Sequence, residues 1–163
     1  MAGNEYTVPG VFDVMAQPTN MTCWATVGAM MMNWRQQVCR SIASAMAQAG
    51  SPWDGMFTRG EGLIASQHQG FASACGMRVE PLMCYPLSTW LANMRRYGPL
   101  AVVTANPYHA RILVGVTERG NPRQTYFRVV DPNGGRRYDL EFGAFTRDFE
   151  AVAQSPRFQL WHY

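Results

Sequence analysis

The chain of 163 residues has the size of one domain, and we expect residues 1–163 to fold as one domain with two lobes around one cleft. Hydrophobic residues make up 47% of the sequence and charged residues 15%, a composition that excludes an intrinsically disordered chain. The net charge of +3 is dispersed, and because no run of positive residues is longer than a pair, nucleic-acid binding is not expected.

The first two thirds of the chain are predicted to be mainly helical. After an extended lead-in and a turn at residues 18–20, apolar residues from Trp24 to Val38 recur at spacings of three and four. This pattern predicts a buried helix with Thr22 as its N-cap. Three further helices are expected over residues 41–49, 61–69 and 88–97, each followed by a glycine that can end it.

After residue 98 the pattern of apolar residues changes to that of strands. We expect strands over residues 100–104, 110–118, 125–131 and 136–141, a short helix around 145–152 and a last strand near 158–161. The layout predicts an α+β fold, in which a helical lobe over about 18–98 packs on an antiparallel sheet lobe over about 99–163.

Neither metal, cofactor nor membrane is expected from the sequence. No apolar stretch approaches the roughly 20 residues that span a bilayer. The cysteines form no CxxC pair and have no adjacent histidine, so they match no zinc pattern. The first residues lack a basic region followed by an apolar run, so no export signal is expected, and reduced thiols are the default for the four cysteines: Cys23, Cys39, Cys75 and Cys84.

One cysteine lies where a thiolate is favoured. Cys23 falls in the first turn of the most buried predicted helix, and unpaired amides and the helix dipole stabilise negative charge there. Taken alone, a cysteine at such a position is more often an inert core residue. Gln17 changes this interpretation, because an amide six residues upstream can fold back and form an oxyanion hole with the Cys23 backbone amide. Cys39, Cys75 and Cys84 are expected to be spectators.

Three histidines are candidates for a base. His109 stands where a loop enters an apolar strand, and Asp131 ends a neighbouring predicted strand, so both can lie at one rim of the sheet. There the carboxylate would fix the imidazole tautomer; a core histidine and a turn-capping aspartate are the alternatives. His68, between two glutamines, is predicted to be a solvated surface residue, and His162 is too close to the terminus to hold catalytic geometry.

These segments together resemble the papain-like cysteine peptidases. The resemblance is carried by Gln17-Pro-Thr-Asn-Met-Thr-Cys23-Trp24-Ala25, by His109 ahead of an apolar strand, and by Val129-Val130-Asp131-Pro132. It implies that Cys23 is the nucleophile, His109 the base, Asp131 the residue that orients it and Gln17 the oxyanion donor. The short chain and the Asp-Pro pair are similar to a compact bacterial branch with bacteriocin-processing peptidases, plant-pathogen effector proteases and secretion-system toxin domains.

The resemblance also implies a biological setting. The expectation is a monomeric effector or toxin, made in the bacterial cytoplasm, exported by a dedicated secretion system without a signal peptide, and acting on a protein substrate in the cytoplasm of a target cell. The producing cell would then need a cognate inhibitor, or immunity, protein. For the walls of the substrate cleft the candidates are Trp53, Asp54, Phe57, Trp90 and Tyr108.

Other functions remain open at this point. A thiol-dependent glutamine deamidase or transglutaminase would use the same nucleophile and base on a different acyl group. A catalytically inactive binding module on the same fold is a second alternative, against which the intact Cys23, His109 and Asp131 argue. A peptidoglycan amidase is disfavoured because the Asp-Cys-Ser opening usual in that group is missing.

Overall fold

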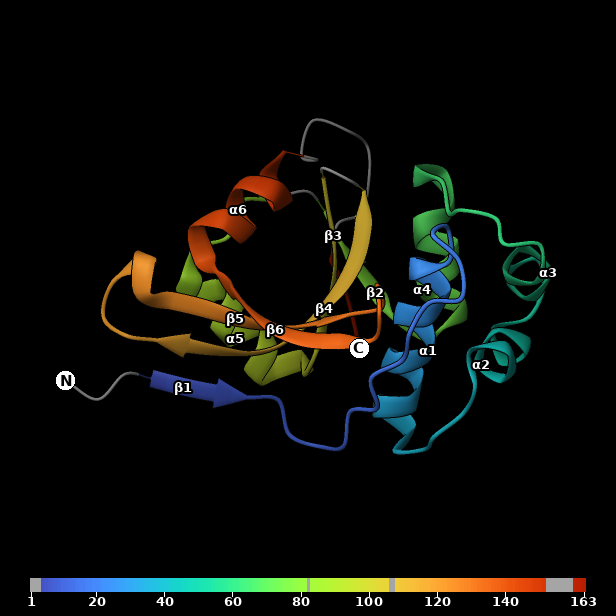
Figure 1. Cartoon of the computed structure of the whole chain (residues 1–163), viewed down its shortest axis with the longest axis horizontal. Helices are drawn as coiled ribbons and strands as arrows, with labels where there is room; N and C mark the ends of the chain where they lie inside the picture. The colour runs from blue at the N-terminus through green and yellow to red at the C-terminus, as the bar shows by residue number, and fades with distance from the viewer. Residues whose placement is uncertain (1–3, 82, 106–107, 152–159) are drawn as a thin grey trace.

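The computed structural model describes residues 4–81, 83–105, 108–151 and 160–163. Helices α1 to α4 gather on one side of the molecule, and an antiparallel sheet with helices α5 and α6 forms the other side (Figure 1). The predicted α+β class is therefore confirmed. In the described part of the chain, no helix is long and apolar enough to cross a membrane.

The helix α1 (Cys23–Gln36) is the centre of the helical part. Residues 24–33 are all buried, because the helix is apolar on every side and packs between the other helices and the sheet. It is followed by α2 (Ile42–Ala49), for which the Ser41 side chain accepts a hydrogen bond from the Ser44 amide at 3.1 Å, and by α3 (Trp53–Thr58), which the sequence did not predict.

The prediction of a helix over residues 61–69 is wrong. Residues 61–64 form no helix, a 3₁₀ turn η1 (Ala65–Gln67) follows, and α4 (His68–Ala74) begins only at His68. The Trp24 indole donates a hydrogen bond to the Glu61 carbonyl at 2.9 Å, which holds this segment along α1. Gly70 lies within α4 instead of ending a helix. An added Cβ there would lie 3.3 Å from the Trp53 ring, so the close packing of α4 on Trp53 favours glycine at this position.

The sheet has the strand order β2-β7-β3-β4-β5-β6, and all of its described pairs are antiparallel. Strand β1 pairs with the C-terminal half of β4. In the described residues the strands of the sheet are β1 (Asn4–Thr7), β2 (Arg78–Glu80), β3 (Leu100–Thr104), β4 (His109–Glu118), β5 (Thr125–Asp131), β6 (Arg136–Glu141) and β7 (Leu160–His162). The bounds of β3, β5 and β6 agree with the sequence prediction, and β4 starts one residue earlier. The short strands β1 and β2 were missed, and residues 158 and 159 of the expected last strand lie outside the described residues.

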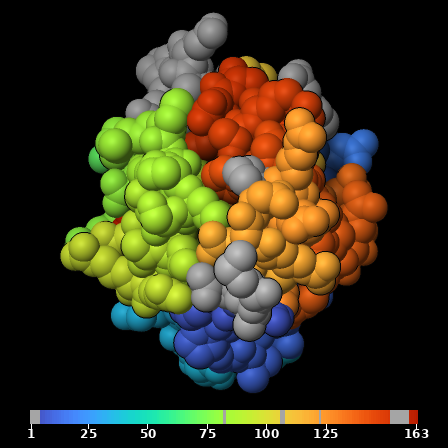
Figure 2. Space-filling view, turned by 90° about the vertical axis from the view of Figure 1, so that its left-hand side faces the viewer, coloured from blue at the N-terminus to red at the C-terminus, as the bar shows by residue number. Residues whose placement is uncertain are grey.

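Two hydrophobic clusters cover the two faces of the sheet. Ile112 and Val130 pack in the cluster around α1, whereas their neighbours Leu113 and Val129 pack in the other cluster, as strand alternation requires. The second cluster includes α5 (Leu87–Tyr97) and α6 (Phe142–Glu150), and Figure 2 shows this side of the molecule.

The packing divides differently from the lobes expected from the sequence. Helix α5 and strand β2 come before residue 99 in the chain but pack with the sheet, and β1 joins the sheet from the N-terminal segment. Helix α6 starts three residues earlier than expected, and residue 152 at its expected end lies outside the described residues.

Candidate active site

The thiol of Cys23 lies at the first position of α1. Thr22 is the N-cap residue by position, yet its hydroxyl donates to the Thr19 carbonyl at 3.1 Å and thereby closes the preceding turn. Burial opposes a thiolate at Cys23, but hydrogen bonds from the His109 side chain and the Ala110 amide, the charge of His109 and the Trp24 amide together lower the pKa of the thiol. The position therefore favours an ionised sulfur.

His109 connects this thiol to a buried carboxylate. It is the first residue of β4, buried, and its Nε2 lies 2.6 Å from Oδ1 of Asp131. An ionised carboxylate only accepts, so Nε2–H is the donor, and Nδ1 is the ring nitrogen that faces Cys23. Burial disfavours the imidazolium, but the hydrogen bonds to Asp131 and Cys23 and their charges raise the pKa of His109 to about 9.

Asp131 is held at the end of β5 by four donors. Its Oδ1 accepts from His109 and from the Asn133 amide at 2.8 Å, and its Oδ2 accepts from the Tyr138 hydroxyl at 3.0 Å and from Arg111 Nε at 3.3 Å. Burial opposes its charge, but the hydrogen bonds from His109, the Asn133 amide and the Tyr138 hydroxyl, together with the His109 charge, lower the pKa of Asp131 to about 2. The carboxylate is thus ionised over the whole neutral range.

Gln17 lies in the loop that leads into α1, and this loop is fastened to the turn after Asp131. The Gln17 backbone amide donates to the Pro132 carbonyl at 2.8 Å, and one N–H of its side chain donates to the Thr19 carbonyl at 2.8 Å. Gly135 in the same turn has a φ of +59°, and an added Cβ there would lie 3.0 Å from the Ala16 nitrogen. The β5–β6 turn therefore positions both Asp131 and Gln17.

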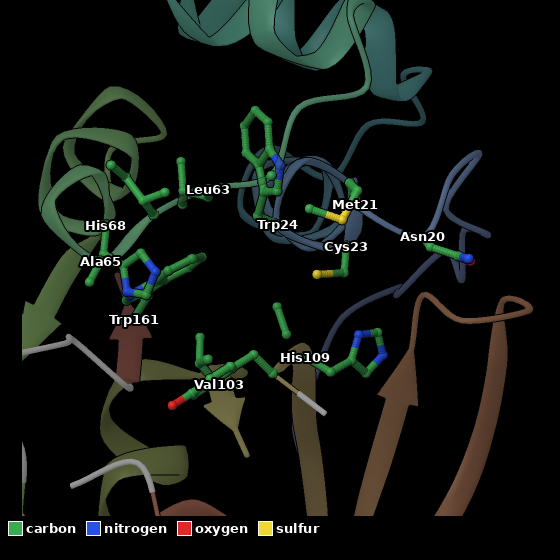
Figure 3. Close-up of a pocket in the computed structure, with 14 residues that line it drawn as sticks. Asn20, Met21, Cys23, Trp24, Leu63, Ala65, His68, Val103, His109 and Trp161 are labelled. Atoms are coloured by element: carbon green, nitrogen blue, oxygen red, sulfur yellow. The ribbon is translucent and has the colours of Figure 1, made fainter. Parts of the chain in front are cut away.

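A pocket of about 260 Å³ opens beside the thiol. In Figure 3 the Cys23 sulfur lies between His109 and Asn20 on one side and His68 and Trp161 on the other. The lining comes from the start of α1, residues 62–65, α4 and three strands, and it consists of Asn20, Met21, Cys23, Trp24, Gly62, Leu63, Ile64, Ala65, His68, Val103, Tyr108, His109, Ala110 and Trp161. Three of these residues, Met21, Ile64 and Tyr108, are exposed apolar or aromatic side chains at its rim.

The prediction that His68 is a solvated surface residue is wrong. Its side chain is buried in the pocket lining, with its ring edge-on to Trp161 at a centroid distance of 5.6 Å. The flanking glutamines suggested a polar surface, but α4 starts at His68 and its first turn packs towards β7. Sequence reasoning also missed Trp161 and Val103, because no local signal shows which strands border Cys23.

Of the five expected wall residues, Tyr108 lines the pocket. Trp53 packs against Trp24 in the cluster around α1, and Trp90 lies in the cluster on the other face of the sheet. The other two, Asp54 and Phe57, belong to α3 and do not line it.

The remaining candidate groups lie apart from the pocket. His162 is buried, and its Nε2 lies 2.7 Å from Glu80. All four cysteines are free. Burial raises the pKa of Cys75 to about 12, and hydrogen bonds to carboxylates raise the pKa of Cys39 and Cys84. Within the described ranges, no three His, Cys, Asp or Glu side chains gather where they could hold a metal ion.

Comparison with known proteins bears on both family and fold. Residues 2–150 match the family model described as papain-like cysteine protease AvrRpt2. No curated protein sequence matches the chain. A solved chain from work on limited antibody cross-reactivity between the mite allergens Blo t 1 and Der p 1 is similar with a TM-score of 0.56 and 10% identity, over 98% of this chain and 69% of that chain. At this identity the likeness shows the fold alone.

Proposed function

The chain belongs to the papain-like cysteine protease family of AvrRpt2, and from this premise we propose that it is an endopeptidase with Cys23 as nucleophile, His109 as base and acid, and Asp131 as the residue that orients His109. The observation that carries the proposal is the continuous contact from thiol to imidazole to carboxylate, with 2.6 Å between His109 Nε2 and Asp131 Oδ1. Such a chain of contacts activates a thiol at neutral pH.

In this mechanism the Cys23 thiolate attacks the scissile carbonyl carbon and a C–S bond forms. The carbonyl oxygen becomes an oxyanion, which the Cys23 backbone amide and the second N–H of the Gln17 side chain stabilise. The C–N bond then breaks as His109 gives its proton to the leaving amine. In the second half, His109 takes a proton from water, the hydroxide attacks the thioester, and the thiolate is released.

The pocket beside Cys23 accepts an apolar side chain of the substrate in this proposal. Its walls are mostly apolar, with Leu63, Val103 and Trp161 among them, and burial of a large apolar side chain is worth about 1.5–3 kcal/mol. The exposed Met21, Ile64 and Tyr108 extend the apolar surface beyond the pocket, where a protein chain can lie along it.

We extend the proposal to the biological setting. The enzyme acts as a bacterial effector or toxin on a protein in the cytoplasm of a target cell, it is exported by a dedicated system, and the producing cell holds a cognate inhibitor protein. A chain with four free cysteines, one of which must stay reduced to react, fits a reducing compartment. Expression of wild type and Cys23→Ala inside recipient cells tests this setting, with growth and loss of a host protein as readouts.

The peptidase proposal is tested with a bacterial lysate, by sequencing new protein N-termini after treatment with three proteins. Wild type and the matched control Cys39→Ala should generate the same new N-termini, and Cys23→Ala should generate none. Equal cleavage by Cys23→Ala would contradict the proposal. A gain of about one dalton at glutamines, without new N-termini, would identify a deamidase instead.

A further inference from the structure

A polar cluster, made of Arg111, Asp131 and Tyr138, lies on the sheet face opposite α1. Arg111 stands between Ala110 and Ile112, which pack in the cluster around α1, so strand alternation directs Arg111 to the other face. Asp131 follows Val130 in the same way. None of these three residues lines the pocket beside the thiol. Their direct link to the site is the contact of Asp131 with His109.

Arg111 is the cation of this cluster and is fixed at two points. Its Nε donates to Asp131 Oδ2 at 3.3 Å, and its Nη1 donates to the hydroxyl of the buried Thr104 at 3.2 Å. The Arg111 side chain is 20% exposed and that of Asp131 is 2% exposed, so solvent screens their interaction little. The carboxylate is therefore shared between a guanidinium on one oxygen and the His109 imidazole on the other.

The His109 imidazolium and the Arg111 guanidinium both bind the Asp131 carboxylate, and their positive charges repel each other. The Asp131 charge favours the imidazolium form of His109, whereas the positive charge of Arg111 disfavours it. The orientation of Asp131 depends less on Arg111, because the Asn133 amide and the Tyr138 hydroxyl also hold its two oxygens. The main influence of Arg111 on His109 is therefore its charge.

We propose that Arg111 is a positioning residue that holds Oδ2 of Asp131, shares its negative charge, and so limits the basicity that Asp131 confers on His109. The inference rests on the proposed roles of Cys23 and His109. The charge of Arg111 matters for the reaction because an imidazolium that is too stable is a poor acid towards the leaving amine. By opposing the imidazolium, Arg111 makes the thiolate–imidazolium pair less stable and so leaves the His109 proton easier to transfer.

The charged or titratable groups near His109 lie on α1, β4, β5 and β6. Cys23 on α1 and Asp131 on β5 favour the imidazolium. Arg111 on β4, which pairs with Asp131, opposes it by its positive charge. Burial raises the pKa of Tyr138 on β6 to about 12, so this phenol stays neutral in the working range. The Arg136 guanidinium lies 5.5 Å from the Tyr138 ring centroid.

The test is an NMR titration of the ¹⁵N-labelled imidazoles, which needs no substrate. The chain has three histidines, so His68→Gln and His162→Gln assign the His109 signals. Arg111→Met should raise the midpoint of His109 by about 0.5–1 pH unit. Arg111→Lys keeps the charge and should stay within about 0.3 units of wild type, and Tyr138→Phe should shift the midpoint by less than half as much as Arg111→Met.

In a peptide-cleavage assay with casein fragments, the alkaline limb of kcat/KM for Arg111→Met should move to higher pH by the same amount as the His109 midpoint. KM should stay unchanged. A lowered His109 midpoint in Arg111→Met would overturn the inference, because it would show that Arg111 acts by orientation alone. An unchanged midpoint, or an equal shift in Tyr138→Phe, would overturn it too. Arg111→Gln replaces Arg111→Met if that variant does not fold. Since the titration is independent of cleavage, failure of the peptidase proposal is seen separately, as absence of cleavage by wild type.

Discussion

Replacing Asp131 with asparagine tests the site most sharply, because it changes one charge and almost no volume. The carboxylate accepts four hydrogen bonds, two on each oxygen. An amide offers one oxygen and one NH₂ group, so two donors must face the NH₂ group. If the NH₂ group faces His109, the imidazole must accept at Nε2 and carry its proton on Nδ1, towards Cys23, which is the wrong tautomer for a base.

The size of the effect follows from the His109 pKa, which is raised from 6.5 to about 9 against the opposing effect of burial. Cys23 and Asp131 share this shift, and loss of the carboxylate charge should remove about one to two units. Each unit corresponds to about 1.4 kcal/mol and to a tenfold smaller ratio of thiolate–imidazolium to thiol–imidazole. Because the wild-type site already favours the thiolate, the thiolate fraction falls by less than this ratio, and alkylation of Cys23 at neutral pH should slow by at most about ten- to a hundredfold.

The assay is the rate of Cys23 alkylation by iodoacetamide as a function of pH, followed by the mass of the Cys23 peptide. In Asp131→Asn the acid limb should move to higher pH, and the alkaline limb of kcat/KM, measured on a peptide, to lower pH. Asp131→Ala should show the same direction and a larger loss of rate. A profile of Asp131→Asn identical to wild type, together with a strong response to His68→Ala, would refute the assignment of His109 and Asp131.

The same variant has a stability signature with a defined sign. The pKa of Asp131 is lowered from 3.8 to about 2 in the folded protein, so its charge contributes stability that is present above about pH 4. This contribution is lost as the pH falls towards 2. The difference in free energy of unfolding between wild type and Asp131→Asn should therefore shrink between pH 4 and pH 2. A difference that stays constant over this range would contradict the ionised, paired state of Asp131.

Three further predictions concern the surroundings of the thiol. Gln17→Ala should lower kcat by about two to three orders of magnitude with little change in the thermal midpoint; full turnover would mean that other donors form the oxyanion hole. Gly135→Ala should lower both kcat and the thermal midpoint, because its φ is +59° and its Cβ would press on the loop before Gln17; an unchanged thermal midpoint would contradict this close approach. Iodoacetamide at neutral pH should modify Cys23 before the more exposed Cys39 and Cys84, whose pKa values are raised; mass spectrometry of the labelled peptides would contradict this by finding either of them first.

The sequence determined the features that depend on neighbouring residues. The start of α1 at Cys23 follows from the turn residues before it and the apolar residues after it, and the bounds of β3, β5 and β6 follow from turn residues on both sides. Strand alternation and chain order also placed His109 at the start of one strand and Asp131 at the end of another. These are short-range properties, and a pattern of side chains is enough to fix them.

The packing of the elements determines which of these groups meet. The sheet register pairs Ile112 with Val130, which places Asp131 beside the start of β4, where its side chain meets that of His109. Likewise, the burial of His68, the pairing of β1 with β4 and the contact of Arg111 with Asp131 depend on residues far apart in the chain. The polar residues around His68 form a sequence pattern that is also typical of surface helices. His68 is buried here because Trp161, on a strand at the other end of the chain, packs against it.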